Sequence, residues 1–372
     1  MAIPRTNDVD RETTRGTGRA IAALLAGAWR RPAPSVAIDP AELARLVPWL
    51  VRSGAAPLAW GVVRDTPLAT SAAARELHRI TVGQVGAAIV QEREIATVFA
   101  ALRAEGIEPL LSKGWAIARH YPEPGLRPSA DIDLFVHPAD RDRAGRRLAA
   151  PDLAPLRVDL HAGFDDLPDR SFGELFARSE LVTLNGDTVR VPALDDLVRH
   201  LALHLLRHAA WRPMWFADLA VIMESRHLAL DWDRLFRGAS LYNGWVRTTF
   251  ALAHTLLGAR LDGTPVADEP ARLPDWLEPA VFAHWEALDL HNYDGIPIAS
   301  FFSRPAGLFR ALARRWPSPL LATVNRRAAF DRAPRLPLQI ADCLARAAHA
   351  LVRLPLTLRE QALADKDDVP QY

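Results

Sequence analysis

Alternating apolar and polar residues predict a short β-strand in the first half of the chain. In residues 130–136, Ile132, Leu134 and Val136 alternate with Asp131 and Asp133. Successive side chains of a strand point to opposite faces, so the apolar residues share one face and the two aspartates share the other. The sequence therefore predicts a strand that is anchored on one side and carries a pair of carboxylates on the other.

Two further stretches have the composition of strands that pair with it. Residues 107–111 are mainly apolar, and residues 156–161 alternate again, with Asp159 and His161 on the face opposite to the apolar side chains. This alternation places Asp159 and His161 on the same face of a predicted strand.

A hairpin is predicted after these strands. Residues 181–184 and 188–191 are rich in β-branched residues, and Asn185-Gly186 lies between them. Asn-Gly supplies the positive backbone angles of a tight hairpin turn. With the preceding strands, the hairpin predicts a small mixed sheet.

Helical periodicity dominates the chain on both sides of the predicted sheet. Residues 72–105 carry an apolar stripe at Ile95, Val98, Phe99 and Leu102. A second stripe consists of Leu194, Leu197, Val198, Leu201 and Leu205. Both stripes have the spacing of one helix face. The expected fold class is α+β, with an N-terminal helical region (1–105), a sheet domain (106–192) and a larger C-terminal helical domain (193–372).

Composition narrows the functional classes. The 372 residues are 49% hydrophobic and 24% charged, with a net charge of +1, so no overall positive charge drives nonspecific nucleic-acid binding. Cys343 is the sole cysteine, which excludes an internal disulfide and favours a reducing compartment. No secretory pattern and no apolar run of membrane-spanning length is found, so we expect a cytoplasmic protein with no membrane span.

The carboxylate pair suggests divalent-cation chemistry. Mg²⁺ prefers hard oxygen ligands and is commonly held by a few carboxylates plus substrate phosphates. The polar turn Ser112-Lys113-Gly114 precedes the pair, and Gly114 allows close approach of a phosphate to the backbone. Lys113 is one of two lysines in the chain and would add a positive charge.

The segment that contains Lys113, Gly114, Arg127, Asp131, Ile132 and Asp133 resembles the bacterial uncharacterised nucleotidyltransferases of the DNA polymerase β-type superfamily. In that family a Lys-Gly turn precedes a helix, and an Arg-x-x-x-Asp-Ile-Asp segment follows. The wider superfamily has Gly-Gly or Gly-Ser in the turn, so this chain departs from the general pattern there.

The resemblance implies a third catalytic acid, for which Asp159 in Asp159-Leu160-His161 is the best candidate. Asp165 and Asp166 lie shortly afterwards in a predicted loop and are rival candidates. The implied catalytic and metal-binding residues are thus Asp131, Asp133 and Asp159. Ser112, Lys113, Gly114 and Arg127 are the implied nucleotide-binding residues.

The resemblance implies Mg²⁺, with Mn²⁺ as an alternative, and a nucleoside triphosphate as donor. The expected reaction moves a nucleoside monophosphate to an unknown acceptor and releases pyrophosphate. A noncatalytic protein that keeps the fold and binds a nucleotide or another partner is the alternative.

Several residues have more than one interpretation at this stage. Arg127 could bind phosphate or pair with Asp131. Asp218 could reach the cleft with Arg212, cap a helix or form a buried pair. His161 is expected to be a structural histidine more often than a ligand.

Three histidines on one helix, His200, His204 and His208, suggest zinc because they recur every four residues. The sequence shows no HExxH pattern, and three or four converging ligands are required. A polar edge of a core helix is therefore the favoured interpretation.

Residues 304–353 contain ten arginines against Asp331 and Asp342. This charge predicts either an anionic partner or a solvated helical face. Single tryptophans, among them Trp245, Trp285 and Trp316, are expected to be core anchors.

Overall fold

The computed structural model describes residues 16–287 and 315–349. The chain divides into two compact units, Met1–Leu288 and Asp289–Tyr372, and each is described by itself. The three parts expected from the sequence divide the chain differently, and they stay a prediction.

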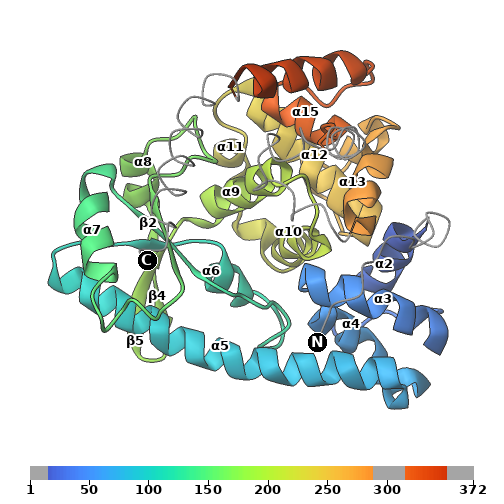
Figure 1. Cartoon of the computed structure of the whole chain (residues 1–372), viewed down its shortest axis with the longest axis horizontal. Helices are drawn as coiled ribbons and strands as arrows, with labels where there is room; N and C mark the ends of the chain where they lie inside the picture. The colour runs from blue at the N-terminus through green and yellow to red at the C-terminus, as the bar shows by residue number, and fades with distance from the viewer. Residues whose placement is uncertain (1–15, 288–314, 350–372) are drawn as a thin grey trace, which may run out of the picture. The chain divides into compact units, whose positions relative to one another are not determined.

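The first unit begins with helices (Figure 1). These are α2 (Thr17–Leu25), α3 (Pro40–Ser53), α4 (Ala56–Val63), a 3-10 turn (Pro67–Thr70) and α5 (Ala72–Ala104). Asp39 starts α3 because its side chain accepts hydrogen bonds from the backbone N–H groups of Ala41 and Glu42, both at 2.8 Å.

The long helix α5 is anchored near its two ends. Ala73, Ala74 and Leu77 are buried at its start, and Ile95, Val98, Phe99 and Leu102 are buried near its end. Between them Val85 meets the loop after α6, where Gly125 has φ +80° and a Cβ would clash with the Val85 side chain. Only a glycine can pass this close.

A three-stranded sheet follows, in the order β1 (Leu110–Leu111), β2 (Ile132–Val136), β3 (Val158–Ala162). Strand β1 is antiparallel to β2, and β2 is parallel to β3. The hairpin of β4 (Glu180–Leu184) and β5 (Asp187–Val191) lies with β5 beside β1. Short helices connect these strands: α6 (Gly114–Ala118), α7 (Arg141–Leu148) and α8 (Phe172–Arg178).

The rest of the first unit is helical. It contains α9 (Leu194–Arg207), α10 (Pro213–Arg226), α11 (Trp232–Leu235), α12 (Ser240–Leu257) and α13 (Leu277–Glu286). Helix α9 packs against α10, α11 and α12. In the second unit, α15 (Pro319–Asn325) precedes helical residues 336–349.

The expected α+β class with a small mixed sheet and helical flanks is confirmed. The first strand is shorter than residues 107–111, because only Leu110 and Leu111 pair with β2, and Pro109 has no N–H to donate to a ladder. The helix expected after the Lys-Gly turn is short and spans Gly114–Ala118. Among residues 16–287 and 315–349, no helix combines the length and apolar character that crossing a bilayer requires.

Two expectations concern the second unit. Trp316 is 45% exposed, so its assignment as a core anchor is wrong. Of the arginine-rich stretch, residues 304–314 and 350–353 lie outside the described residues. Within the described part, Asp342 forms ion pairs with Arg326 and Arg346. The anionic partner stays a prediction.

A buried ion pair joins the loop before β2 to α10. Arg127 Nη2 lies 3.1 Å from Asp218 Oδ2, and the Tyr121 hydroxyl donates to Asp218 Oδ1 at 2.7 Å. Asp218 is fully buried. Of the sequence interpretations of Asp218, the structure shows the buried pair. Arg127 pairs with Asp218 rather than with Asp131.

Replacing one member of this pair leaves the other charge buried and unpaired. We expect Asp218→Asn to lower the free energy of unfolding by about 3–5 kcal/mol, measured by urea denaturation with circular dichroism. The matched control is Glu76→Gln, which breaks the exposed Glu76–Arg79 pair of α5 and should leave the midpoint unchanged. If both substitutions lowered the free energy of unfolding equally, the expected contribution of the buried Arg127–Asp218 pair would be contradicted.

Candidate active site

Two neighbouring strands bring acidic side chains together. In the parallel pairing of β2 and β3, Asp133 lies opposite Asp159 and Phe135 lies opposite His161. Asp131 precedes β2 by one residue and shares the face of Asp133, because residues two apart point the same way. The apolar side chains of Ile132, Leu134 and Val136 are buried. The alternation in the sequence thus separates an apolar face from a face with the acids.

Lys113 neutralises Asp133. Its Nζ lies 2.5 Å from Asp133 Oδ1, and the side chains are 12% and 8% exposed. Lys113 has φ 55° and ψ −145°, a backbone conformation that residues other than glycine rarely adopt. This backbone conformation directs the chain from β1 into α6 at the site.

The residue after Lys113 must be a glycine for steric reasons. It has φ +32°, and a Cβ there would lie 2.8 Å from the hydroxyl of Ser129. The Lys-Gly turn is therefore fixed by both residues: the lysine supplies the charge, and the glycine allows the close approach of the loop before β2.

His161 lies between two carboxylates. Its Nε2 is 3.1 Å from Asp159 Oδ2 and 3.6 Å from Asp133 Oδ1. The Nε2 atom is buried without a hydrogen bond in favourable geometry to any described residue, and the ring stacks on Phe135 with centroids 4.5 Å apart. A buried nitrogen that faces two carboxylate oxygens fits a cation between them.

The electrostatics of the two β2 acids differ. For Asp133, burial tends to raise the pKa, but the imidazole of His161 and the ammonium of Lys113 outweigh it, so the pKa is lower than usual. For Asp131, desolvation and the negative charge of Asp133 raise the pKa above its usual range. Mutually repelling carboxylates with unequal pKa values are typical of cation sites and catalytic sites.

Helix α5 fixes the segment before β2. The Gln91 side-chain amide donates to the carbonyl of Asp131 at 2.9 Å and to Ser129 Oγ at 3.2 Å. Trp115 Nε1 donates to Glu92 on the same helix at 2.9 Å. The sequence interpretation missed Gln91, because a glutamine on an exposed helix face has no distinguishing pattern.

Besides Lys113, two other predicted nucleotide-binding residues are engaged within the protein. Ser112 donates its backbone N–H to the Asp133 carbonyl at 3.2 Å, and its hydroxyl lies 2.9 Å from His200 Nδ1. Arg127 is held by Asp218. Their roles toward a nucleotide stay predictions.

Arg212 is a second arginine near the acids. Its guanidinium lies 4.4 Å and 5.4 Å from the ring centroids of Trp211 and Trp215. Among the described residues, no carboxylate forms an ion pair with it, and its buried Nε has no hydrogen-bond partner. Burial and Arg127 lower the pKa of Arg212, while Asp131 opposes that shift, so the guanidinium lies within electrostatic range of the site.

The histidines of α9 do not form the trio suggested by their spacing. His200 and His204 meet Asp166 of the loop after β3. The structure does not place His208 in this group, although its ring packs on His204. Burial and the neighbouring His204 lower the pKa of His208 to about 4. Asp165, the other rival for the third acid, is exposed.

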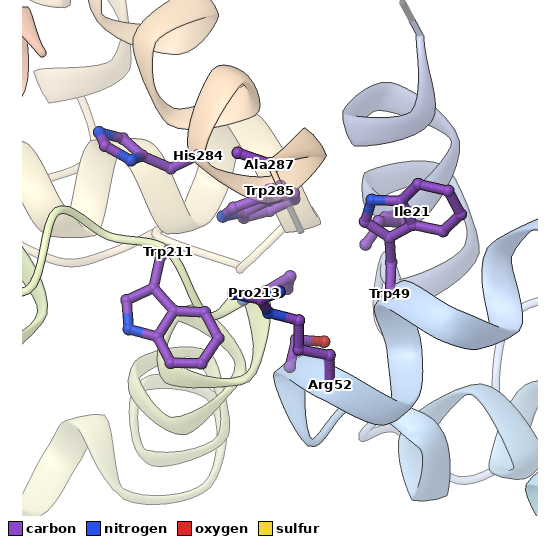
Figure 2. A pocket seen from close by; sticks show the side chains of 9 residues that line it. Ile21, Trp49, Arg52, Trp211, Pro213, His284, Trp285 and Ala287 are labelled. Carbon is purple, nitrogen blue, oxygen red and sulfur yellow. The ribbon is translucent and has the colours of Figure 1, made fainter. Parts of the chain in front are cut away.

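A small pocket elsewhere in the first unit does not coincide with the acids (Figure 2). It is lined by Ile21, Trp49, Arg52, Ser53, Trp211, Pro213, His284, Trp285 and Ala287. No carboxylate is among the residues that line it. We therefore place the candidate active site at the acidic face of the sheet.

The acidic group can hold a divalent cation. One ligand atom each of Asp133, Asp159 and His161 lie within 4.8 Å of one another. Asp131 is not part of this close group, although it lies next to it on the same face. The carboxylate oxygens suit Mg²⁺, and the imidazole nitrogen makes the set equally suited to Mn²⁺.

A short mixed sheet with acids on adjacent strands and a Lys-Gly turn before a helix is the arrangement of a nucleotidyltransferase core. The sequence model of a family described as "Uncharacterised nucleotidyltransferase" matches residues 39–159 and 153–258. The chain belongs to this family, as its sequence motifs indicated. No curated protein and no solved structure matches the chain.

The Lys113–Asp133 pair can be tested by a double-mutant cycle. Lys113→Met leaves the buried Asp133 without its closest counter-charge, so we expect a loss of about 3 kcal/mol in the free energy of unfolding. Combining it with Asp133→Asn should recover roughly 1–3 kcal/mol relative to the sum of the single effects. Urea denaturation of the four proteins measures the coupling, and strictly additive effects would contradict it.

Proposed function

We propose that the protein is a Mg²⁺-dependent nucleotidyltransferase that transfers a nucleoside monophosphate from a nucleoside triphosphate to an acceptor. The observation that carries this proposal is the register of β2 and β3, which sets Asp133 beside Asp159. The membership of the family supports the same reaction class.

The proposed reaction is an in-line displacement. An acceptor hydroxyl attacks the α-phosphorus, an oxygen–phosphorus bond forms, and the bond from the α-phosphorus to the bridging oxygen breaks. Pyrophosphate leaves with the bond electrons, and Asp159 takes the acceptor proton. Asp159 suits this role because its side chain is 53% exposed and can meet an acceptor that arrives from solvent.

Asp131, Asp133 and Asp159 would hold Mg²⁺, with His161 beside them. When bound, the cation supplies charge stabilisation at the phosphate oxygens. Lys113 and Gly114 would line the phosphates at the turn. Arg212 offers a further positive charge, since the described carboxylates leave its guanidinium unpaired.

Nucleotide binding tests the proposal without knowledge of the acceptor. Calorimetric titration of each nucleoside triphosphate should show binding that requires Mg²⁺, and Asp131→Asn/Asp133→Asn should weaken it at least about tenfold, or 1.4 kcal/mol. The loss is expected because the phosphates and the carboxylates share the cation.

The control for this titration is Asp165→Asn, an exposed acid of the loop after β3, which should bind like the unaltered protein. Absence of binding for every nucleotide, in protein shown to be folded, would overturn the proposal. Pyrophosphate release in an acceptor screen would then extend a positive result to catalysis.

The raised pKa of Asp131 gives a pH prediction. Protonated Asp131 cannot bind a cation, so Mg²⁺ affinity should fall as the pH is lowered, starting above the ordinary carboxyl value of 3.8. In Asp131→Asn the fall should begin at lower pH, because the pKa of the remaining Asp133 is lowered. Titration of Mg²⁺ at a series of pH values checks this, and the same profile in both proteins would refute it.

One observation favours a noncatalytic protein as the second candidate. The Lys113 ammonium lies against Asp133 Oδ1, where a cation would bind. Nucleotide binding that is independent of Mg²⁺, unaffected by Asp133→Asn and without pyrophosphate release would support this candidate.

A further inference from the structure

A second group of metal-ligating side chains lies beyond Phe135. The Phe135 ring stacks on His161 of the acidic site and meets His200 edge-on, with centroids 5.2 Å apart. We propose that Asp166, His200 and His204 bind a borderline divalent cation such as Zn²⁺. This site is separate from the acidic face, and the proposal does not depend on nucleotidyl transfer.

The distances fit a coordination shell. Asp166 Oδ2 lies 2.9 Å from His204 Nδ1 and 3.4 Å from His200 Nε2, and the three ligand atoms lie within 4.8 Å of one another. Zinc binds nitrogen and oxygen at about 2.0–2.2 Å, so neighbouring ligands of an octahedral or tetrahedral ion are separated by about 2.8–3.6 Å. Both separations from Asp166 Oδ2 agree with this range.

Two of the ligands have outer partners that orient them. His200 Nδ1 lies 2.9 Å from Ser112 Oγ, and Arg207 Nη1 donates to Asp166 Oδ1 at 2.7 Å. When the imidazole donates its Nδ1–H to Ser112, the lone pair of Nε2 faces the Asp166 carboxylate, and a metal ion between the two atoms stabilises this arrangement. Such outer hydrogen bonds are a regular feature of metal-bound histidines and carboxylates.

The donor set selects the class of metal. Two imidazoles and one carboxylate suit zinc and other borderline divalent ions, whereas Mg²⁺ prefers oxygen alone. His204 and Asp166 are 15% and 13% exposed, so an ion can enter and a water molecule can complete the shell. The edges of Phe135 and Phe164 meet His200 from the apolar side.

The ion would link α9 to the loop after β3. Because Ser112 contacts His200, the ion would also restrict the motion of the turn that contains Lys113. Because the unfolded chain does not hold this geometry, binding should raise the melting temperature.

Metal binding to the full-length protein tests the proposal. After removal of metals with a chelator, titration with ZnCl₂ should show one tight site, and Co²⁺ in its place should give visible absorption bands. His204→Gln and Asp166→Asn should abolish this site and the rise in melting temperature caused by zinc. Ser112→Ala should weaken zinc binding by roughly 10- to 100-fold.

Two matched variants locate the site. His208→Gln removes the next histidine of the sequence pattern, and Asp133→Asn disrupts the acidic group; both should keep the zinc site. Loss of the site in Asp133→Asn with retention in His204→Gln would overturn the proposal. Unaltered protein that takes up neither Zn²⁺ nor Co²⁺ at micromolar concentration would also overturn it, whatever the variants do.

Discussion

The buried charge of Asp133 is the constraint on which the site depends. A carboxylate in the middle strand of a sheet must be compensated, because an unpaired buried charge costs several kcal/mol. The compensation comes from both neighbours of β2: Lys113 follows β1 and pairs with Asp133, and His161 on β3 lies 3.6 Å away. The three strands are therefore joined by charge as well as by their backbone ladder. The unusual backbone of Lys113 accompanies this pairing, in which the residue after β1 directs its ammonium to Asp133 on the neighbouring strand β2.

The surroundings of Asp133 come from distant parts of the chain. Gln91 on α5 holds the carbonyl of Asp131, Asp218 on α10 holds Arg127, and Ser112 reaches His200 on α9. Each link is a hydrogen bond or an ion pair made by a buried or half-buried group, and such groups need partners. The helices before and after the sheet are thus part of the site, which agrees with a family match that extends over residues 39–258 rather than over the strands alone.

Local patterns predicted what depends on local geometry. The alternation around Asp131 and Asp133, the hairpin at Asn185-Gly186 and the stripe of α9 follow from strand and helix periodicity, and all are found. The partners could not be predicted, because they depend on how elements pack. The spacing of His200, His204 and His208 places all three on one helix face, but the position of the loop after β3 decides that Asp166 meets the first two. In the same way the sequence left a phosphate and Asp131 open as partners of Arg127, and the packing of α10 supplies Asp218. The exposure of Trp316 shows that residue type alone does not predict burial.

Helix α5 sets the distance between two parts of the first unit. Its buried anchors end at Leu77 and resume at Ile95, a separation of 18 residues or about 27 Å along a helix. The N-terminal helices pack at one end, the hairpin strand β5 packs against the helix at the other, and the loop that carries Gly125 crosses between them (Figure 1). The length of α5 therefore sets the distance that the loop with Gly125 spans before the chain reaches Asp131. Inserting one helical turn between Leu77 and Gln91 would lengthen this span by about 5.4 Å. The insertion would shift Gln91 relative to the N-terminal helices, so the length of α5 contributes to the position of the Asp131 carbonyl that Gln91 holds.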